Sequence, residues 1–262
     1  MLLLILLIFL STPSVQTEIA KRVTTYVNDH YSTDIQIERL GLNWKGQVDI
    51  REVLIKDHHD DTLIYSQKVQ TDFLNFRNLL NNKMGLGNTR LTNAKLYYKQ
   101  YKGEKRDNLS LFGDKFQTGR PSSGSVFTLG TKNLELINGV VTILNENLET
   151  AEVFNFSGIN IAANDFKLTG PQVEAEILKL SLFSKRGLIL KQLEGDFLYS
   201  VEGIVLNDLK LETAGSKVSG DISLFHGGKG FSDFYNDVII TADIENTKIL
   251  TDDLNSFYNE FG

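Results

Sequence analysis

The sequence predicts a mainly β protein: an elongated, curved antiparallel sheet that follows an N-terminal amphipathic helix. Three observations support this fold class. Apolar and polar residues alternate along most of the chain, only one short segment has clear helical amphipathicity, and 21 glycines stand against 3 prolines in 262 residues. Many strands joined by tight turns have this composition. The hydrophobic content of 41% is sufficient for a folded core.

The net charge of −6 and the absence of cysteine exclude several functions. A protein that binds duplex DNA needs a basic face, so we expect no nucleic-acid partner. Disulfides, thiolate zinc sites and cysteine nucleophiles are excluded together.

The chain begins with an uninterrupted apolar run. A membrane span needs roughly 20 apolar residues and the core of a signal peptide about 7–15. We interpret residues 1–12 as part of a transmembrane anchor, with a cleaved signal peptide or a buried strand as alternatives. The anchor residues are Leu2, Leu3, Leu4, Ile5, Leu6, Leu7, Ile8, Phe9 and Leu10.

An amphipathic helix is predicted directly after this run. Val15, Ile19, Val23 and Val27 recur every four residues and form one stripe of a helix. Ser14 is the expected N-cap, and the helix should end near residues 28–31.

From residue 34 onward the apolar period falls to two, which predicts strands. In the first part, residues 13–116, these lie at 35–44, 48–50, 63–69 and 91–101, and residues 73–80 fit one or two helical turns. Residues 117–125 (QTGRPSSGS) read as an exposed loop.

The second part, residues 126–262, continues the alternation. Strands are predicted at 134–137, 140–144, 159–163, 173–183, 188–193, 197–201, 205–211, 217–225 and 238–244. Asn138-Gly139 lies between two of them and predicts a hairpin turn. Residues 251–262 fit a short helix. Residues 90–98, 133–143 and 208–222 share a loose repeat, which is typical of stacked strand units.

Strands that are half apolar and half polar form a sheet with one dry face. Two such sheets could pack together, one sheet could curl on itself, or an incomplete curl could leave an apolar groove. The periodicity does not choose among these arrangements.

No motif predicts catalysis or metal binding. His58 and His59 can bind metals, but neighbours on a strand point to opposite faces, and we interpret both as residues of a solvated turn. Residues 119–124 have the spacing of a phosphate loop without its lysine. We therefore expect no enzyme, no cofactor and no metal site.

The order of several segments carries a family resemblance. After the apolar start come residues 15–23 (VQTEIAKRV), 31–42 (YSTDIQIERLGL) and 46–65 (GQVDIREVLIKDHHDDTLIY). Residues 109–112 (LSLF), 164–171 (NDFKLTGP) and 254–262 (LNSFYNEFG) extend the similarity over nearly the whole chain. The chain resembles the N-terminal region of the TamB family, the translocation and assembly module subunits among AsmA-like proteins.

The resemblance implies a single-pass inner-membrane protein with a periplasmic body. Its strands would form a taco-shaped β-groove, related to the chorein-type bridge-like lipid transfer proteins, that carries phospholipid to the outer membrane and supports outer-membrane biogenesis. A partner would be an Omp85-type outer-membrane barrel, engaged by a C-terminal part beyond these residues. We therefore expect 126–262 to be a truncated continuation of the groove.

The groove would be lined by the apolar positions of the alternating strands, although a one-residue slip reverses the face of a strand. The candidates are Ile35, Ile37, Val48, Ile50, Leu96, Tyr98, Val141, Ile143, Ile159, Ile161, Leu180, Leu182, Ile222 and Leu224, with Ile239 and Thr241 or their neighbours at the end. Two other functions remain open: an assembly factor that holds outer-membrane proteins at strand edges, and an enzyme or carbohydrate-binding β-solenoid.

Overall fold

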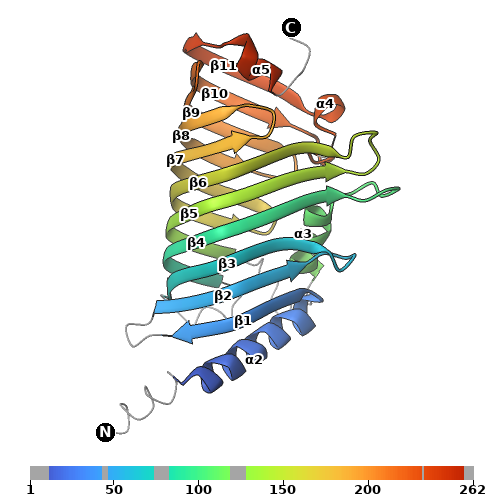
Figure 1. Ribbon diagram of the computed structural model, residues 1–262, viewed down its shortest axis with the longest axis vertical. Helices are drawn as coiled ribbons and strands as arrows, with labels where there is room; N and C mark the ends of the chain where they lie inside the picture. Colours follow the sequence, from blue (N-terminus) through green and yellow to red (C-terminus); the bar gives the residue numbers. More distant parts are fainter. Residues whose placement is uncertain (1–11, 43–46, 74–82, 119–127, 232, 257–262) are drawn as a thin grey trace.

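The computed structural model describes residues 12–42, 47–73, 83–118, 128–231 and 233–256. Within them, 11 strands form a single sheet in which each strand lies beside its neighbours in the sequence. Figure 1 shows a tall, strongly curled sheet with a helix along one end. The prediction of a mainly β fold with an N-terminal helix is confirmed.

The strands are long, and several exceed the predicted segments. They are β1 (Asp34–Leu42), β2 (Gln47–Lys56), β3 (Thr62–Phe73), β4 (Lys83–Gln100), β5 (Thr128–Asn145), β6 (Glu152–Thr169), β7 (Gln172–Ser184), β8 (Ile189–Tyr199), β9 (Gly203–Thr213), β10 (Lys217–Phe225) and β11 (Ile239–Lys248). The helices are α2 (Pro13–Tyr31), α3 (Asn108–Thr118), α4 (Phe234–Asp237) and α5 (Thr251–Asn255).

The prediction of an entirely antiparallel sheet is wrong at one pair. β4 and β5 are parallel, in register from Lys83 beside Thr128 to Gln100 beside Asn145. A parallel pair needs a long connection that returns the chain to its starting end, and residues 101–127, which include α3, provide it. The sheet is therefore mixed, with every other pair antiparallel.

The predicted helix is α2, and it begins two residues earlier than expected. Pro13 is its first residue and Thr12, rather than Ser14, is the N-cap. Proline is favoured at this position because its missing N–H would be unpaired there. At the other end, the Asn28 amide donates to the carbonyl of Ile35 and accepts its N–H, both at 2.9 Å. These bonds fix α2 along β1 (Figure 1).

The predicted hairpin at Asn138-Gly139 is wrong, because both flanking segments belong to β5. Asn138 has a φ of +55°, and the register with β6 shifts beside it. A Cβ on Gly139 would lie 2.8 Å from Cδ2 of Leu136. The pair therefore forms a corner within one strand, where asparagine accepts the left-handed backbone and glycine permits close packing.

Corners of this kind recur along the sheet. Residues with positive φ stand within β2, β4, β9 and β11 at Glu52, Asn93, Asp208 and Asn246. In β8, Gly195 has a φ of +146°, so the two strands predicted at 188–193 and 197–201 are one bent strand. Bends at neighbouring positions of several strands curl the sheet (Figure 1).

Other predictions have mixed outcomes. Turns at residues 170–171, 185–187 and 226–228 follow β6, β7 and β10, and α5 confirms a short helix within 251–262. Two predictions are wrong where they overlap the described residues: residue 73, predicted helical, ends β3, and residues 117 and 118, predicted as a loop, belong to α3. The rest of those segments (74–80 and 119–125) and the anchor residues 2–10 lie outside the described residues. α3 was not predicted; it begins where an Asp107 carboxylate oxygen accepts the N–H of Ser110 at 2.7 Å.

Two clusters form the buried core. One joins β7 to β10 through Ile177, Leu190, Leu193, Leu209 and Val218. The other joins β6 to the connection between β10 and β11, where the rings of Phe154 and Phe234 meet edge to face at 5.2 Å. This connection crosses to β4 as well, because the Phe231 N–H donates to the Tyr98 hydroxyl at 3.0 Å.

Candidate functional site

An unbroken row of aliphatic side chains crosses the sheet. Each residue is the direct partner of the next on the adjacent strand, so all of them share one face. This central apolar row consists of Leu40, Ile50, Val69, Leu91, Leu136, Ile161, Leu180, Leu193, Leu211 and Val218, from β1 to β10.

A second apolar row runs beside it on the other side of the corners. It crosses β1 to β6 and consists of Ile35, Ile55, Ile64, Leu96, Val141 and Phe156. The corner residues Asn93 and Asn138 lie between the two rows, and the Asn138 amide donates to Asn93 Oδ1 at 2.7 Å. The corner therefore separates the two apolar rows along these strands.

Burial differs along the central apolar row. Its members on β1 to β7, and Leu211 on β9, are half-buried, whereas Leu193 and Val218 are only 8% and 9% exposed. The last strands are thus closed by the molecule's own side chains. The earlier strands keep part of their aliphatic surface accessible.

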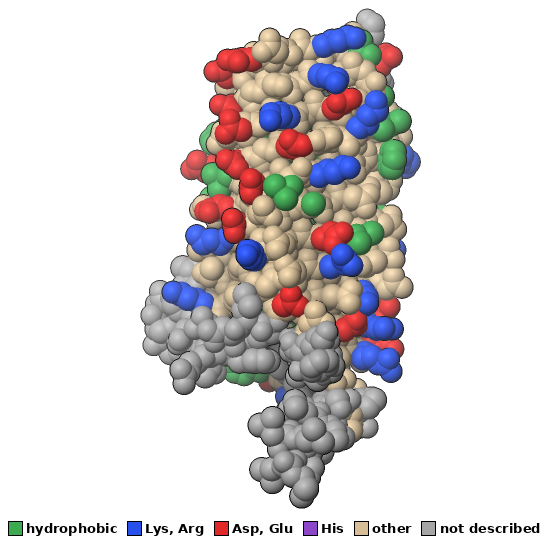
Figure 2. All heavy atoms as spheres, turned by 90° about the vertical axis from the view of Figure 1, so that its left-hand side faces the viewer, with side chains coloured by type: hydrophobic (Ala, Val, Ile, Leu, Met, Phe, Trp, Pro, Cys, Tyr) green, Lys and Arg blue, Asp and Glu red, His purple; other side chains and the backbone are tan. Residues whose placement is uncertain are grey.

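The opposite face of the sheet is polar. Between members of the central apolar row, Arg90 and Glu135 form an ion pair at 2.6 Å, and Lys68 and Asp49 another at 3.1 Å. Figure 2 shows lysine, arginine, aspartate and glutamate side chains distributed over the face that it presents, with few hydrophobic ones. The sheet is therefore amphipathic across its thickness.

A depression of about 830 Å³ lies over β2 to β6. Its lining mixes Val48 and Leu134 with Asp49, Arg90 and Glu135. Such a lining does not fit a hydrocarbon ligand, so the apolar rows, rather than this depression, carry the functional argument.

The structure brings many of the predicted lining residues together. Ile50, Ile161 and Leu180 belong to the central apolar row, and Ile35, Leu96 and Val141 to the second. None of the 14 is exposed. The others pair beside these rows: Ile37 with Val53, Val48 with Leu42, Tyr98 with Ile143, Ile159 with Gly139, Leu182 with Leu190, Ile222 with Leu206 and Leu224 with Ile204. Their proposed role stays a prediction.

The prediction left the inward face of β11 open, and the pairing favours Ile240 over Ile239. Ile239 is 64% exposed and pairs with Phe225, while Ile240 pairs with Leu224. The register that sets Ile240 opposite Leu224 depends on how the connection between β10 and β11 returns the chain, and alternation alone does not encode it. Sequence reasoning also missed Val69, Leu91 and Leu136, although the apolar alternation that contains them was recognised.

No described helix is both long enough and apolar enough to cross a membrane. No protein-family model matches the chain, and no curated protein is significantly similar to it. The fold and surface define a class by architecture alone: an open, mainly β protein with one curled amphipathic sheet and an N-terminal helix.

Proposed function

We propose that this protein holds phospholipid acyl chains on its apolar sheet face and lets them move between the inner and outer membranes of a cell envelope. The observation that carries the proposal is the central apolar row, which continues from β1 to β10 without a polar interruption. Function of this kind requires no catalytic group.

The dimensions suit a hydrocarbon path. Neighbouring strands lie about 4.8 Å apart, so the row extends for roughly 43 Å. One leaflet of a bilayer core is about 15 Å thick, half of the full ~30 Å. A row of this length exceeds one acyl chain and would serve as a path rather than a closed pocket.

The energetics favour the same interpretation. A methylene group exposed to water costs about 0.8 kcal/mol relative to an apolar contact. An aliphatic strip along the whole path removes that cost at each position. The headgroup remains in water, and the half-buried side chains of β1 to β7 provide the contact surface.

The cellular setting is part of the same proposal. Residues 1–12 would contribute to a single inner-membrane anchor, and the sheet would stand in the periplasm. Outer-membrane biogenesis would follow through an Omp85-type barrel bound by a further C-terminal part. The apolar run at residues 2–10 and the family resemblance support this setting.

The test is site-specific photocrosslinking in cells, because adjacent residues of β5 face opposite sides. A photoreactive side chain at Leu136 should give a phospholipid adduct, and one at Glu135 should not. Native mass spectrometry of protein purified without detergent should show bound phospholipid. Equal labelling at both positions, or protein free of lipid, would refute the proposal.

A second function has its own supporting observation. β11 pairs with β10 alone among the described strands, and its residues are almost all exposed. A free edge can bind an extended client strand, as an assembly factor for outer-membrane proteins would. Crosslinks from Thr241 to unfolded barrel proteins, without lipid adducts at Leu136, would select this function.

A further inference from the structure

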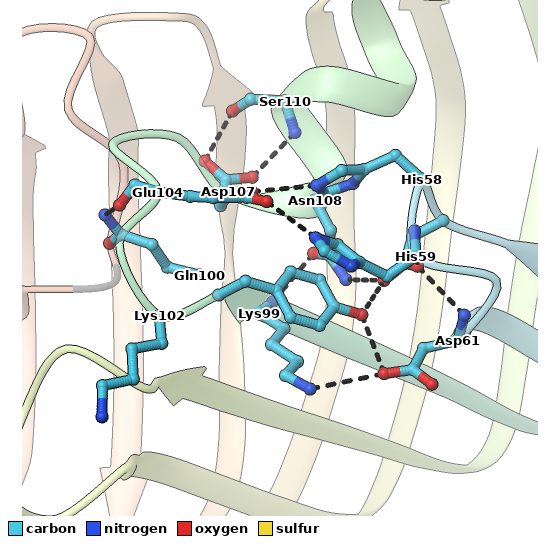
Figure 3. Close-up of polar contacts among 12 residues, drawn as sticks. His58, His59, Asp61, Lys99, Gln100, Lys102, Glu104, Asp107, Asn108 and Ser110 are labelled. Carbon is cyan, nitrogen blue, oxygen red and sulfur yellow. Dashed lines mark hydrogen bonds and ion pairs between the residues drawn. The ribbon is translucent and has the colours of Figure 1, made fainter.

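Two adjacent histidines and one glutamate converge at the ends of β2 and β4 (Figure 3). His58 Nε2 lies 2.9 Å from Glu104 Oε2, and His59 Nε2 lies 2.7 Å from Glu104 Oε1. Within the described part of the chain, their donor atoms all lie within 4.8 Å of one another. The cluster is separate from both apolar rows.

The histidines share a direction because they stand in a turn. Residues 58 and 59 connect β2 to β3, as the sequence predicted, so the alternation of a strand does not apply to them. The buried carboxylate of Asp57 accepts the N–H of His59 at 2.9 Å and that of Asp61 at 3.1 Å. Asp60 completes the turn with a φ of +63°.

Tyr101 holds the imidazoles in place from the other side. Its ring lies 3.9 Å from the ring of His59 and meets that of His58 edge to face at 5.4 Å. Its hydroxyl donates to Asp57 at 2.7 Å. The two histidine rings therefore rest against a buried phenol that is anchored to their own turn.

The segment that carries Glu104 is also fixed. The Glu104 N–H donates to the carbonyl of Tyr101 at 3.0 Å, and the Glu104 carbonyl accepts the Gln100 amide at 2.7 Å. Hydrogen bonds from His59 and His58 hold the pKa of the Glu104 carboxyl below its ordinary value. The carboxylate is thus ionised near neutral pH.

We propose that His58, His59 and Glu104 bind a divalent transition-metal cation of the zinc class, with one imidazole nitrogen from each histidine and a carboxylate oxygen as ligands. Neutral imidazole and carboxylate are the nitrogen and oxygen donors that such ions prefer. The sequence predicted no metal site, because His58 and His59 were interpreted as residues of a solvated turn and no local pattern connects them to Glu104.

The spacing allows an ion after a small adjustment. Tetrahedral zinc with ligands at about 2.0–2.2 Å places them roughly 3.3 Å apart. The two hydrogen-bonded pairs must therefore open by about half an ångström as the ion replaces their protons. The three side chains are 27%, 45% and 31% exposed, which leaves a path from solvent and room for a water ligand.

A bound ion would join two connections of the fold. His58 and His59 belong to the β2–β3 turn, and Glu104 to the segment between β4 and α3. Both lie at the same end of the strands, so the ion would fasten this end of the sheet. An ion that binds the native state but not the unfolded chain raises the stability of the native state.

The experiment uses the full chain, freed of metal with a chelator and titrated with zinc chloride in a calorimeter. The expected result is one site per chain, whose affinity falls at least about tenfold in His58→Asn and in Glu104→Gln. Circular dichroism confirms that each variant is folded.

Two matched variants test the location. His30→Asn and Glu202→Gln remove a histidine and an exposed glutamate outside the cluster, and they should leave the affinity unchanged. A cobalt titration adds a spectroscopic readout, because nitrogen ligation gives a ligand-field spectrum that the cluster variants should lose. No binding by the wild-type chain, or equal loss in the His30→Asn variant, would overturn the proposal.

Discussion

His226 shows how a single residue can link stability to pH. Its side chain is 3% exposed, Nδ1 accepts the N–H of Gly230 at 3.1 Å, and the buried Nε2 has no hydrogen-bond partner among the described residues. Burial lowers the pKa of His226 and outweighs the opposing negative charge of Asp107. The native protein therefore keeps this imidazole neutral at a pH where the unfolded chain protonates it.

This difference predicts acid sensitivity. The unfolded chain gains a proton at His226 near pH 6.5. As pH falls below that value toward the lower native pKa, the free energy of unfolding should decrease by at most about 1.4 kcal/mol per pH unit for this one proton. The substitution His226→Asn keeps an acceptor for the Gly230 N–H, but asparagine does not titrate. The stability of this variant should therefore decline less steeply with falling pH than that of the wild-type protein.

Urea unfolding at about pH 7.5 and about pH 5.5 measures the effect on either side of the ordinary histidine value. The His226→Asn variant will be less stable at both pH values because asparagine fills less space. The readout is therefore the change in the free energy of unfolding between the two pH values, compared between variant and wild type. His30→Asn is the control, since His30 is exposed. An unchanged pH dependence in His226→Asn would contradict the assignment.

At the scale of the element, the corners decide how a strand can curl the sheet. Asn138 has a φ of +55°, donates its backbone N–H to Asn160 Oδ1 at 3.1 Å and donates its amide to Asn93. Most side chains disfavour this backbone by roughly 1–2 kcal/mol. Asparagine reduces that cost and also joins three neighbouring strands.

The substitution Asn138→Ala should therefore destabilise the protein by about 1–2 kcal/mol, because alanine meets the full backbone cost and loses the side-chain bond to Asn93, although its backbone N–H can still donate to Asn160. Asn138→Gly should be milder by about 1 kcal/mol, since glycine adopts positive φ freely. Chemical denaturation ranks the variants. Asn133→Ala is the control: it removes a similar bond to Asn88 at 2.6 Å, but at an extended residue. Equal costs for the alanine and glycine variants at 138 would show that the corner is not strained.

The elements also show what the sequence could predict. Apolar alternation located nearly every described strand because it reflects burial, which is a local consequence of the pleat. The hairpin prediction at Asn138-Gly139 is wrong because both a hairpin turn and a corner within a strand need a residue with positive φ. Whether the chain reverses there depends on pairing with β4, which is distant in the sequence. The contact between Glu104 and His58 was not predicted for the same reason. It depends on where two connections of the fold lie in space, which local sequence patterns do not encode.

At the scale of the whole molecule, the two ends of the sheet differ. α2 packs along β1 and covers that edge, whereas β11 has no described strand on its outer side (Figure 1). Ile240 and Ile244 lie on the same face as the core residue Leu224, yet they are 47% and 41% exposed. An unpaired edge with an apolar face favours pairing with another chain.

The 262-residue chain should therefore self-associate as its concentration rises, through β11. Lysine at Ile240 or Ile244 should shift it toward the monomer, because a buried ammonium would lose its hydration in a paired edge. Val201→Lys is the matched control, since Val201 is 54% exposed in the turn between β8 and β9, away from the edge. Sedimentation velocity over a concentration series measures the association. Among the described strands, β11 alone combines unpaired backbone groups with exposed isoleucines on the face of Leu224. A wild-type chain that stays monomeric, or a Val201→Lys variant that dissociates equally, would therefore show that this edge does not drive association.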